Sequence, residues 1–165
     1  MTLAELNALE RGAAEGELAK CCGSTQWAAT MAGRRPFHDV EQLFQAADET
    51  WWALSSPDWL EAFSHHPRIG ERAAGWARDE QAGTGSASQK IKDELVKWNS
   101  DYERRFGHVF LISATGKQAG EILQQMERRM NNEPAAELKV AAGEQAKITR
   151  LRLEKLLSTE TARVG

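Results

Sequence analysis

The chain has 165 residues, 41% of them hydrophobic, with a formal net charge of −3. This length supports one ordinary hydrophobic core and is too short for two comfortable domains, so a single compact domain over residues 1–165 is expected. Acidic and basic residues alternate without a basic stripe, which argues against nucleic-acid binding. No apolar run approaches the roughly 18 residues of a membrane span, and the N-terminus has no apolar signal core, so the sequence predicts a cytoplasmic protein without a membrane partner.

The first part of the chain predicts short helices. Thr2 begins a capping box in front of apolar residues at near-helical spacing, and Gly12 and Gly16 are expected to limit that helix. A second helical segment over residues 17–22 is expected to end at the following glycine.

Helix signals become stronger between residues 24 and 63. Ser24 or Thr25 can cap a short turn, and Asp39 caps a core helix. Ser56 and Pro57 then begin another short helix, since proline suits the first helical position. The apolar face of the core helix consists of Val40, Leu43, Phe44, Ala47, Trp51 and Leu54.

That short helix leads into residues 63–71, Phe-Ser-His-His-Pro-Arg-Ile-Gly-Glu, which concentrate histidine, arginine and glutamate. Pro67 disfavours helical backbone at His66, so His66 is expected at a helix end with its ring directed away from the body of the protein. An imidazole near a guanidinium and a carboxylate can exchange a proton beside an anionic substrate. The alternative is a simple C-terminal stop signal with a favourable helix-dipole contact.

A loop over residues 69–75 and a polar helical turn over 76–82 are expected next. The clearest helix then begins near Ser86 or Ser88 and ends at Gly107. Its apolar positions are Ile91, Leu95, Trp98, Tyr102 and Phe106.

Residues 108–112 form an apolar run too short for an amphipathic helix. Without a second strand to pair with, the run is interpreted as buried extended chain that can offer main-chain N–H groups to a ligand. Thr115 is expected to cap the following helix, which residues 131–134 end.

The last helix is predicted from Ala135 to about Leu157, with residues 158–165 as a flexible tail. Arg152 lies on the apolar sector of this helix and Arg150 lies outside it. A guanidinium on such a sector needs a partner, so Arg152 is either half of a buried ion pair or a ligand clamp. The fold class is therefore all-α, with about seven or eight helices.

Other polar residues carry weaker signals. The adjacent Cys21 and Cys22 are expected to be reduced thiols. The histidines and cysteines lack ligand spacing, so no metal is predicted. Three basic pairs are interpreted as solvated surface: Arg34–Arg35, Arg104–Arg105 and Arg128–Arg129.

Several strings occur in the order found in one enzyme family. They are Cys22, Ser24 and Trp27; Arg35-Pro36-Phe37; His66-Pro67-Arg68-Ile69-Gly70; Glu80-Gln81; Phe106-Gly107 with the apolar run; and Arg152-Leu153. Together they resemble 2-oxo-4-hydroxy-4-carboxy-5-ureidoimidazoline (OHCU) decarboxylase of uric acid degradation, over nearly the whole chain.

The resemblance implies roles for particular residues. His66 corresponds to the catalytic histidine and Glu80 to the site glutamate, while Arg152 corresponds to the arginine of the C-terminal helix. Substrate contacts are implied for Pro67 and for the main chain near Phe110 and Ile112. One departure is Ala77, because family members often carry a serine there, so no serine role is transferred.

The resemblance also implies an activity: cofactor-independent decarboxylation of OHCU to (S)-allantoin and carbon dioxide by a homodimer. The competing hypothesis is a non-catalytic helical interaction module, in which the His-Pro-Arg turn only ends a helix. A metal-dependent hydrolase would need a ligand cluster that the sequence does not show.

Overall fold

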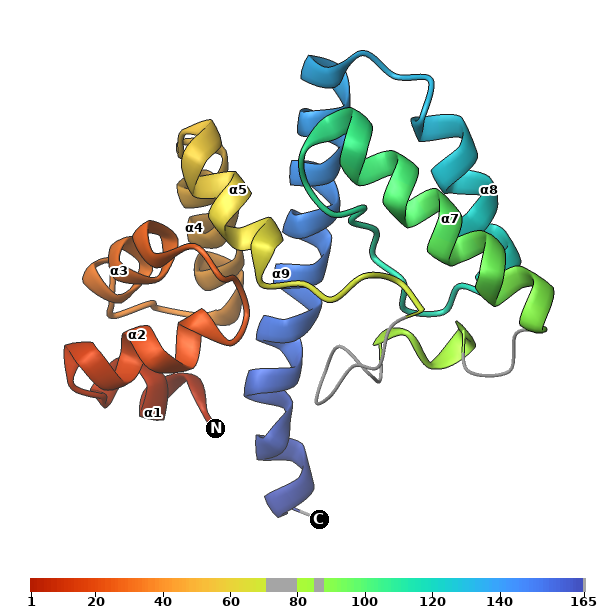
Figure 1. Ribbon diagram of the computed structural model, residues 1–165. Helices are drawn as coiled ribbons and strands as arrows, with labels where there is room; N and C mark the ends of the chain where they lie inside the picture. The colour runs from red at the N-terminus through yellow and green to blue at the C-terminus, as the bar shows by residue number, and fades with distance from the viewer. Residues whose placement is uncertain (71–79, 85–87, 165) are drawn as a thin grey trace. The chain divides into compact units, whose positions relative to one another are not determined.

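The computed structural model describes residues 1–70, 80–84 and 88–164 (Figure 1). These residues form eight α-helices and one short 3-10 helix, η1 at Ala82–Thr84, and they include no β-strand. The predicted all-α fold with seven or eight helices is confirmed. Most of the loop and the polar turn expected over residues 69–82 lie outside the described residues.

Contacts between residues divide the chain into two compact units. The first unit comprises residues 1–62 and 146 onward, and the second comprises residues 63–145. The last helix, α9 (Pro134–Val164), contributes its beginning to the second unit and its remainder to the first. No helix in the described part of the chain is long and apolar enough to cross a lipid bilayer.

The first unit begins with capped helices. The Thr2 hydroxyl accepts a hydrogen bond from the Glu5 N–H, the Ser24 hydroxyl from Trp27, and the Asp39 carboxylate from Gln42, each satisfying an N–H that the helix leaves unpaired. These caps confirm the starts expected at Thr2, Ser24 and Asp39. The helices are α1 (Leu3–Ala8), α2 (Arg11–Ala19), α3 (Thr25–Gly33), α4 (Val40–Trp52) and most of α5 (Ser56–Ser64).

The glycine-limited helix predicted near the N-terminus is wrong. Gly12 and Gly16 lie inside α2, and the chain breaks earlier, at the extended residue Leu9. A glycine inside a helix costs about 1 kcal/mol relative to alanine. Burial of Ala14 and Leu18, both 0% exposed, offsets that cost.

The prediction that both members of the Arg34–Arg35 pair are solvated surface residues is wrong for Arg35. Its half-buried guanidinium donates to the carbonyl oxygens of Leu6 at 2.9 Å and Leu9 at 2.7 Å, while its Nε donates to Ala32 at 2.8 Å. These carbonyls lie at helix ends, where the main chain lacks intrahelical partners. Arg35 therefore completes the hydrogen bonding of α1 and α3.

In the second unit, α7 (Gln89–Phe106) begins after the Ser88 cap and ends at Gly107, whose φ of 79° is left-handed. Both ends agree with the prediction. α8 (Ala119–Arg129) begins later than the Thr115 cap predicted. A turn intervenes, with Gly116 at φ 78° and the Lys117 N–H bonded to the Ala114 carbonyl, because the left-handed glycine cannot continue a helix.

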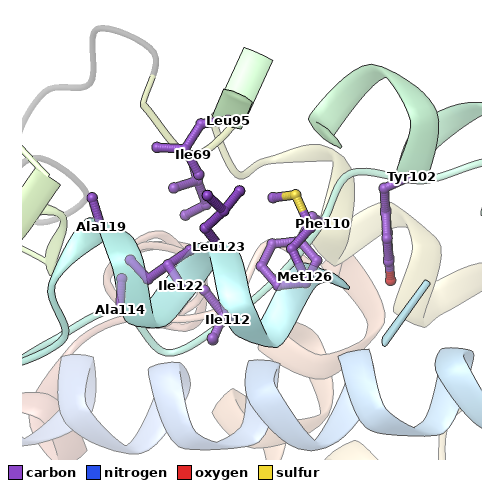
Figure 2. Close-up of a cluster of buried hydrophobic side chains, with 10 residues drawn as sticks. All are labelled: Ile69, Leu95, Tyr102, Phe110, Ile112, Ala114, Ala119, Ile122, Leu123 and Met126. Carbon is purple, nitrogen blue, oxygen red and sulfur yellow. The ribbon is translucent and has the colours of Figure 1, made fainter. Parts of the chain in front are cut away.

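The core of the second unit lies between α7, α8 and the segment that joins them. Figure 2 shows its ten buried side chains, with Phe110 and Met126 near the centre. Ile69, three residues after His66, belongs to the same cluster. The buried residues are Ile69, Leu95, Tyr102, Phe110, Ile112, Ala114, Ala119, Ile122, Leu123 and Met126.

The predicted end of the last helix is also wrong, because α9 continues from Leu157 to Val164. The sequence beyond Leu157 contains no proline or glycine before Gly165, so nothing in it stops the helix. Serine, threonine and glutamate in this stretch have only modest helix penalties.

Candidate active site

His66 follows the end of α5, as predicted. Its main-chain N–H donates to the carbonyl of Phe63 at 3.1 Å. Phe63 is fully buried and packs its ring against that of His108, with 5.2 Å between ring centroids. His65 is exposed, whereas His66 and Pro67 are half-buried. The main chain of the motif is therefore anchored to the core of the second unit.

The ring of His66 is not directed away from the protein, and that prediction is wrong. Its Nε2 lies 2.6 Å from Oε1 of Gln145, a residue of α9 that is 0% exposed. Sequence reasoning missed Gln145. The signal was available, because Gln145 falls between Ala142 and Ile148 on the apolar sector of the last helix, where a polar side chain needs a partner.

Arg68 and Ile69 hold the loop after the histidine. Arg68 pairs with Glu103 of α7, with Nε 2.7 Å from Oε1, and the Ile69 carbonyl accepts from the Asn99 amide at 2.8 Å. Arg68 therefore fixes the loop to α7. A pocket of about 300 Å³ adjoins the loop and is lined by Arg68, Ile69, Gly70, Val96, Asn99, Ser100 and Glu103.

Glu80 belongs to the same unit, and its side chain is only 8% exposed. The neighbouring Gln81 amide oxygen accepts a hydrogen bond from the Gly70 N–H at 3.1 Å, which ties the Glu80 region to the histidine motif. A buried carboxylate must be hydrogen-bonded or charge-compensated. Two other residues of the sequence interpretation, Glu71 and Ala77, lie outside the described residues.

Residues 108–112 form extended chain without regular secondary structure, as predicted, and burial is complete from Phe110 onward. Phe110 and Ile112 are 1% and 4% exposed. The Ser113 N–H donates to Glu144 at 3.2 Å. Within the described residues, no hydrogen bond reaches the main-chain N–H of Phe110 or Ile112. Two donors in an apolar setting suit a ligand with carbonyl or carboxylate oxygens.

A buried ionic network contacts this segment and includes Arg129. The prediction that Arg129 is a solvated surface residue is therefore wrong. Arg129 is 6% exposed and Glu137 is 0% exposed, with Nη2 and Oε2 2.6 Å apart. Arg129 also donates to the Leu111 carbonyl at 2.7 Å and lies over the Phe110 ring at 4.3 Å. Tyr102 donates to Glu137. Burial and this contact with the carboxylate raise the tyrosine pKa above its ordinary value.

Arg152 belongs to the first unit, whereas the other predicted site residues, His66, Pro67, Glu80, Phe110 and Ile112, belong to the second. Its guanidinium is half-buried, and Nη1 lies 3.5 Å from the carbonyl oxygen of Lys20.

Two buried thiols lie near the Arg152 charge. Burial raises the pKa of Cys21 to about 12 and that of Cys22 to about 11, while the positive charge of Arg152 acts in the opposite direction. Both cysteines are free thiols. Thiols that keep their protons in this way are poor nucleophiles, so they are packing groups.

In the described ranges, no group of three or more histidine, cysteine, aspartate or glutamate side chains is arranged to hold a metal ion.

Comparison with known proteins identifies relatives over most of the chain. A family model described as OHCU decarboxylase matches residues 7–154. The uric acid degradation bifunctional protein TTL of Arabidopsis thaliana is 37% identical over 153 residues, which are 87% of this chain and 47% of that protein. The chain thus spans about half the length of this relative. A 2-oxo-4-hydroxy-4-carboxy-5-ureidoimidazoline decarboxylase of Haloferax volcanii is 27% identical over 165 residues, covering 97% of this chain and 98% of that protein.

Two solved structures are similar to this chain in fold. A crystal structure of OHCU decarboxylase in the presence of (S)-allantoin matches with a TM-score of 0.80 and 36% identity, covering 86% of this chain and 97% of that one. A crystal structure of (S)-allantoin synthase matches with a TM-score of 0.73 at 18% identity, covering 95% of this chain and 54% of that one. The second likeness supports the fold alone.

Proposed function

Because the chain belongs to the OHCU decarboxylase family, we propose that this protein decarboxylates OHCU to (S)-allantoin and carbon dioxide. The observation that carries the proposal is the match at 36% identity to nearly the whole of an OHCU decarboxylase crystallised in the presence of (S)-allantoin. The half-buried histidine after α5 and the buried carboxylate of Glu80 are suited to this chemistry.

The reaction needs an electron sink, and the substrate contains one. The carboxylate is on a ring carbon that bears a hydroxyl group and adjoins a C=N bond. When the bond to the carboxylate breaks, carbon dioxide leaves and the electron pair moves toward the C=N nitrogen, which takes a proton. Loss of the hydroxyl proton and protonation of the neighbouring ring carbon then give allantoin. The ring supplies the sink, so the proposed reaction uses no cofactor.

The protein then has to supply orientation, electrostatic stabilisation and controlled proton transfer. In the proposal, His66 takes the hydroxyl proton or stabilises its charge. Glu80 accepts hydrogen bonds from ring or ureido N–H groups, and Arg152 holds a carbonyl oxygen or the carboxylate. Pro67 and the main chain at Phe110 and Ile112 complete the substrate contacts.

Two further proposals concern assembly, which rests on the family resemblance, and location, which rests on the sequence itself. We propose that the protein acts as a homodimer. Light scattering measures the molar mass of the purified protein at the concentrations used in activity assays and tests this proposal. We also propose a cytoplasmic location, for which the two reduced cysteines are suitable.

The function is tested with chelator-treated protein and freshly prepared OHCU, by following carbon dioxide release and the circular dichroism of the allantoin product. Faster and enantioselective formation of (S)-allantoin is expected. His66→Asn should reduce turnover at least about 100-fold, the usual contribution of a positioned acid or base. His65→Ala is the matched control, because that neighbouring ring is exposed. Equal turnover with and without the protein would exclude this activity.

A further inference from the structure

Gln145 is one of the buried polar residues in the described part of the chain. It lies inside α9, where Ala141, Ala142 and Ile148 form the surrounding apolar sector, and its side chain is 0% exposed. An apolar residue of similar size would pack there without a polar atom to satisfy. The amide oxygen instead lies 2.6 Å from Nε2 of His66, across 79 positions of sequence.

This contact has a consequence for the histidine ring. A carbonyl oxygen of an amide accepts hydrogen bonds and cannot donate them. The ring nitrogen facing it must therefore carry the hydrogen, and the basic lone pair of the neutral imidazole then belongs to Nδ1. Which ring nitrogen is protonated is set by the hydrogen bond that the other one makes.

We propose that Gln145 is a positioning residue that holds His66 in the Nε2–H tautomer and makes Nδ1 the nitrogen that exchanges the proton with substrate. The catalytic part of this inference rests on the proposed function. In the forward step, the substrate O–H bond breaks, a bond forms between its proton and Nδ1, and the ring becomes an imidazolium. The electron pair of the broken bond remains on the substrate oxygen.

An amide is better suited than a carboxylate to this position. Its oxygen accepts from Nε2–H both before and after Nδ1 takes a proton, so the ring orientation is unchanged through the step. A buried carboxylate would strongly favour the imidazolium even without substrate and would leave no basic nitrogen. The neutral acceptor at Nε2 therefore fixes the ring orientation without itself favouring the imidazolium.

The tautomer is measured directly by two-dimensional 15N–1H correlation spectra of protein labelled at its four histidines. The His66→Asn variant identifies the His66 signals by their disappearance. For the wild-type protein we expect the Nε2–H pattern at a pH where the ring is neutral. In Gln145→Met, which keeps side-chain length and removes the acceptor, we expect a mixture of tautomers or the Nδ1–H form.

Thr149→Val is the matched control, since it also removes a buried polar group from α9 and Thr149 hydrogen-bonds with Cys22. It should keep the wild-type His66 pattern. If Gln145→Met does not fold, as judged by circular dichroism, Gln145→Leu is measured in its place, and the wild-type spectrum alone already tests the tautomer. An Nδ1–H pattern in the wild-type protein, or an unchanged pattern in the folded variant, overturns the inference.

Kinetics provide the second readout. Gln145→Met should lower kcat about tenfold, a part of the ~10²–10⁴-fold contribution of a positioned acid or base, with KM nearly unchanged. A normal kcat in a variant with a changed tautomer would overturn the catalytic part. If the wild-type protein shows no activity toward OHCU, the proposed function fails, and the spectra still decide whether Gln145 sets the tautomer.

Discussion

Arg129 in the second unit and Arg152 in the first are both arginines of helices that face a core, but their surroundings differ. Arg129 is almost completely buried, and its nitrogens bond to Glu137 and to the Leu111 carbonyl. Arg152 is half-buried, and its contact with the Lys20 carbonyl is long, at 3.5 Å.

Burial of a guanidinium is therefore not by itself a sign of ligand binding. A fully buried charge is tolerated when a carboxylate neutralises it and its donors are satisfied, as for Arg129. Arg129 is therefore structural: it holds the main chain at Leu111 and packs on the Phe110 ring. Arg152, with less of its surface covered, remains the arginine proposed to bind substrate.

Breaking the buried Arg129–Glu137 ion pair should change stability more than any other substitution considered below. Glu137→Gln leaves Arg129 buried without its countercharge and should lower the free energy of unfolding by about 3–5 kcal/mol. Urea denaturation followed by circular dichroism measures this change.

A double variant sharpens that result. Arg129→Met combined with Glu137→Leu removes both charges and should be less destabilised than Glu137→Gln alone, because no uncompensated charge remains. A loss below about 1 kcal/mol in the single variant would show that the pair does not carry the stability assigned to it.

The thiols beside Arg152 predict a pH dependence. In the folded protein Cys21 and Cys22 keep their protons to about pH 12 and 11, whereas unfolded cysteines release theirs near pH 9. Above pH 9 the unfolded state therefore binds fewer protons, and stability falls as pH rises. We expect a loss of about 1–2 kcal/mol between pH 8 and 9.5 in reducing urea titrations.

The matched control is the Cys21→Ala, Cys22→Ala variant, in which this decline should largely disappear. An equally steep decline in the double variant would assign the pH dependence to other groups. The comparison is made below pH 10 because Tyr102, whose pKa is also raised, acts in the same direction at higher pH.

Local signals predicted much of this fold, because caps and helix stops depend on neighbouring residues. Ser24, Asp39, Ser88 and Gly107 act where the sequence predicts. The error at Gly12 arose because tertiary burial outweighed a local helix penalty, and packing cannot be read from one segment.

Site residues depended more strongly on long-range contacts. The resemblance identified His66 and Glu80, which the structure describes as a residue just after α5 and a buried carboxylate. Basic pairs suggested a surface position for Arg129, yet its partner Glu137 comes from the next helix. Gln145 was missed because its partner His66 lies 79 positions away in the sequence.

The comparison extends to carboxylates, since Glu80 is buried like Glu137 but is proposed to bind substrate. Glu80→Gln keeps the size and removes the charge, so catalytic efficiency should fall roughly 10–100-fold, the value of a hydrogen bond to a charged group. Steady-state assays and thermal melts are measured together. A large fall in Tm with nearly normal activity would make Glu80 a structural residue.

Arg152→Lys tests the arginine that was compared with Arg129 above. Lysine keeps the charge and loses the planar fork that binds carboxylates through two hydrogen bonds, so efficiency should fall about tenfold. The free energy of unfolding should change much less than in Glu137→Gln. Unchanged kinetics, or a product complex in which Arg152 contacts only protein groups, would leave Arg152 as a second structural arginine.

The smallest effect is expected for Arg150, two residues before Arg152 on the same helix. Its side chain is 57% exposed, with Nε 3.5 Å from Glu154 and the guanidinium over the Phe44 ring at 4.4 Å. Exposed ion pairs and exposed cation–π contacts each contribute at most about 1 kcal/mol, so Arg150→Ala should lower stability by about 1 kcal/mol or less. Because Arg150 lies outside the apolar sector, kcat and KM should match the wild-type values. If Arg150→Ala impaired catalysis as strongly as Arg152→Lys, the effect would not be specific to Arg152. The assignment of the substrate contact to Arg152 would then be wrong.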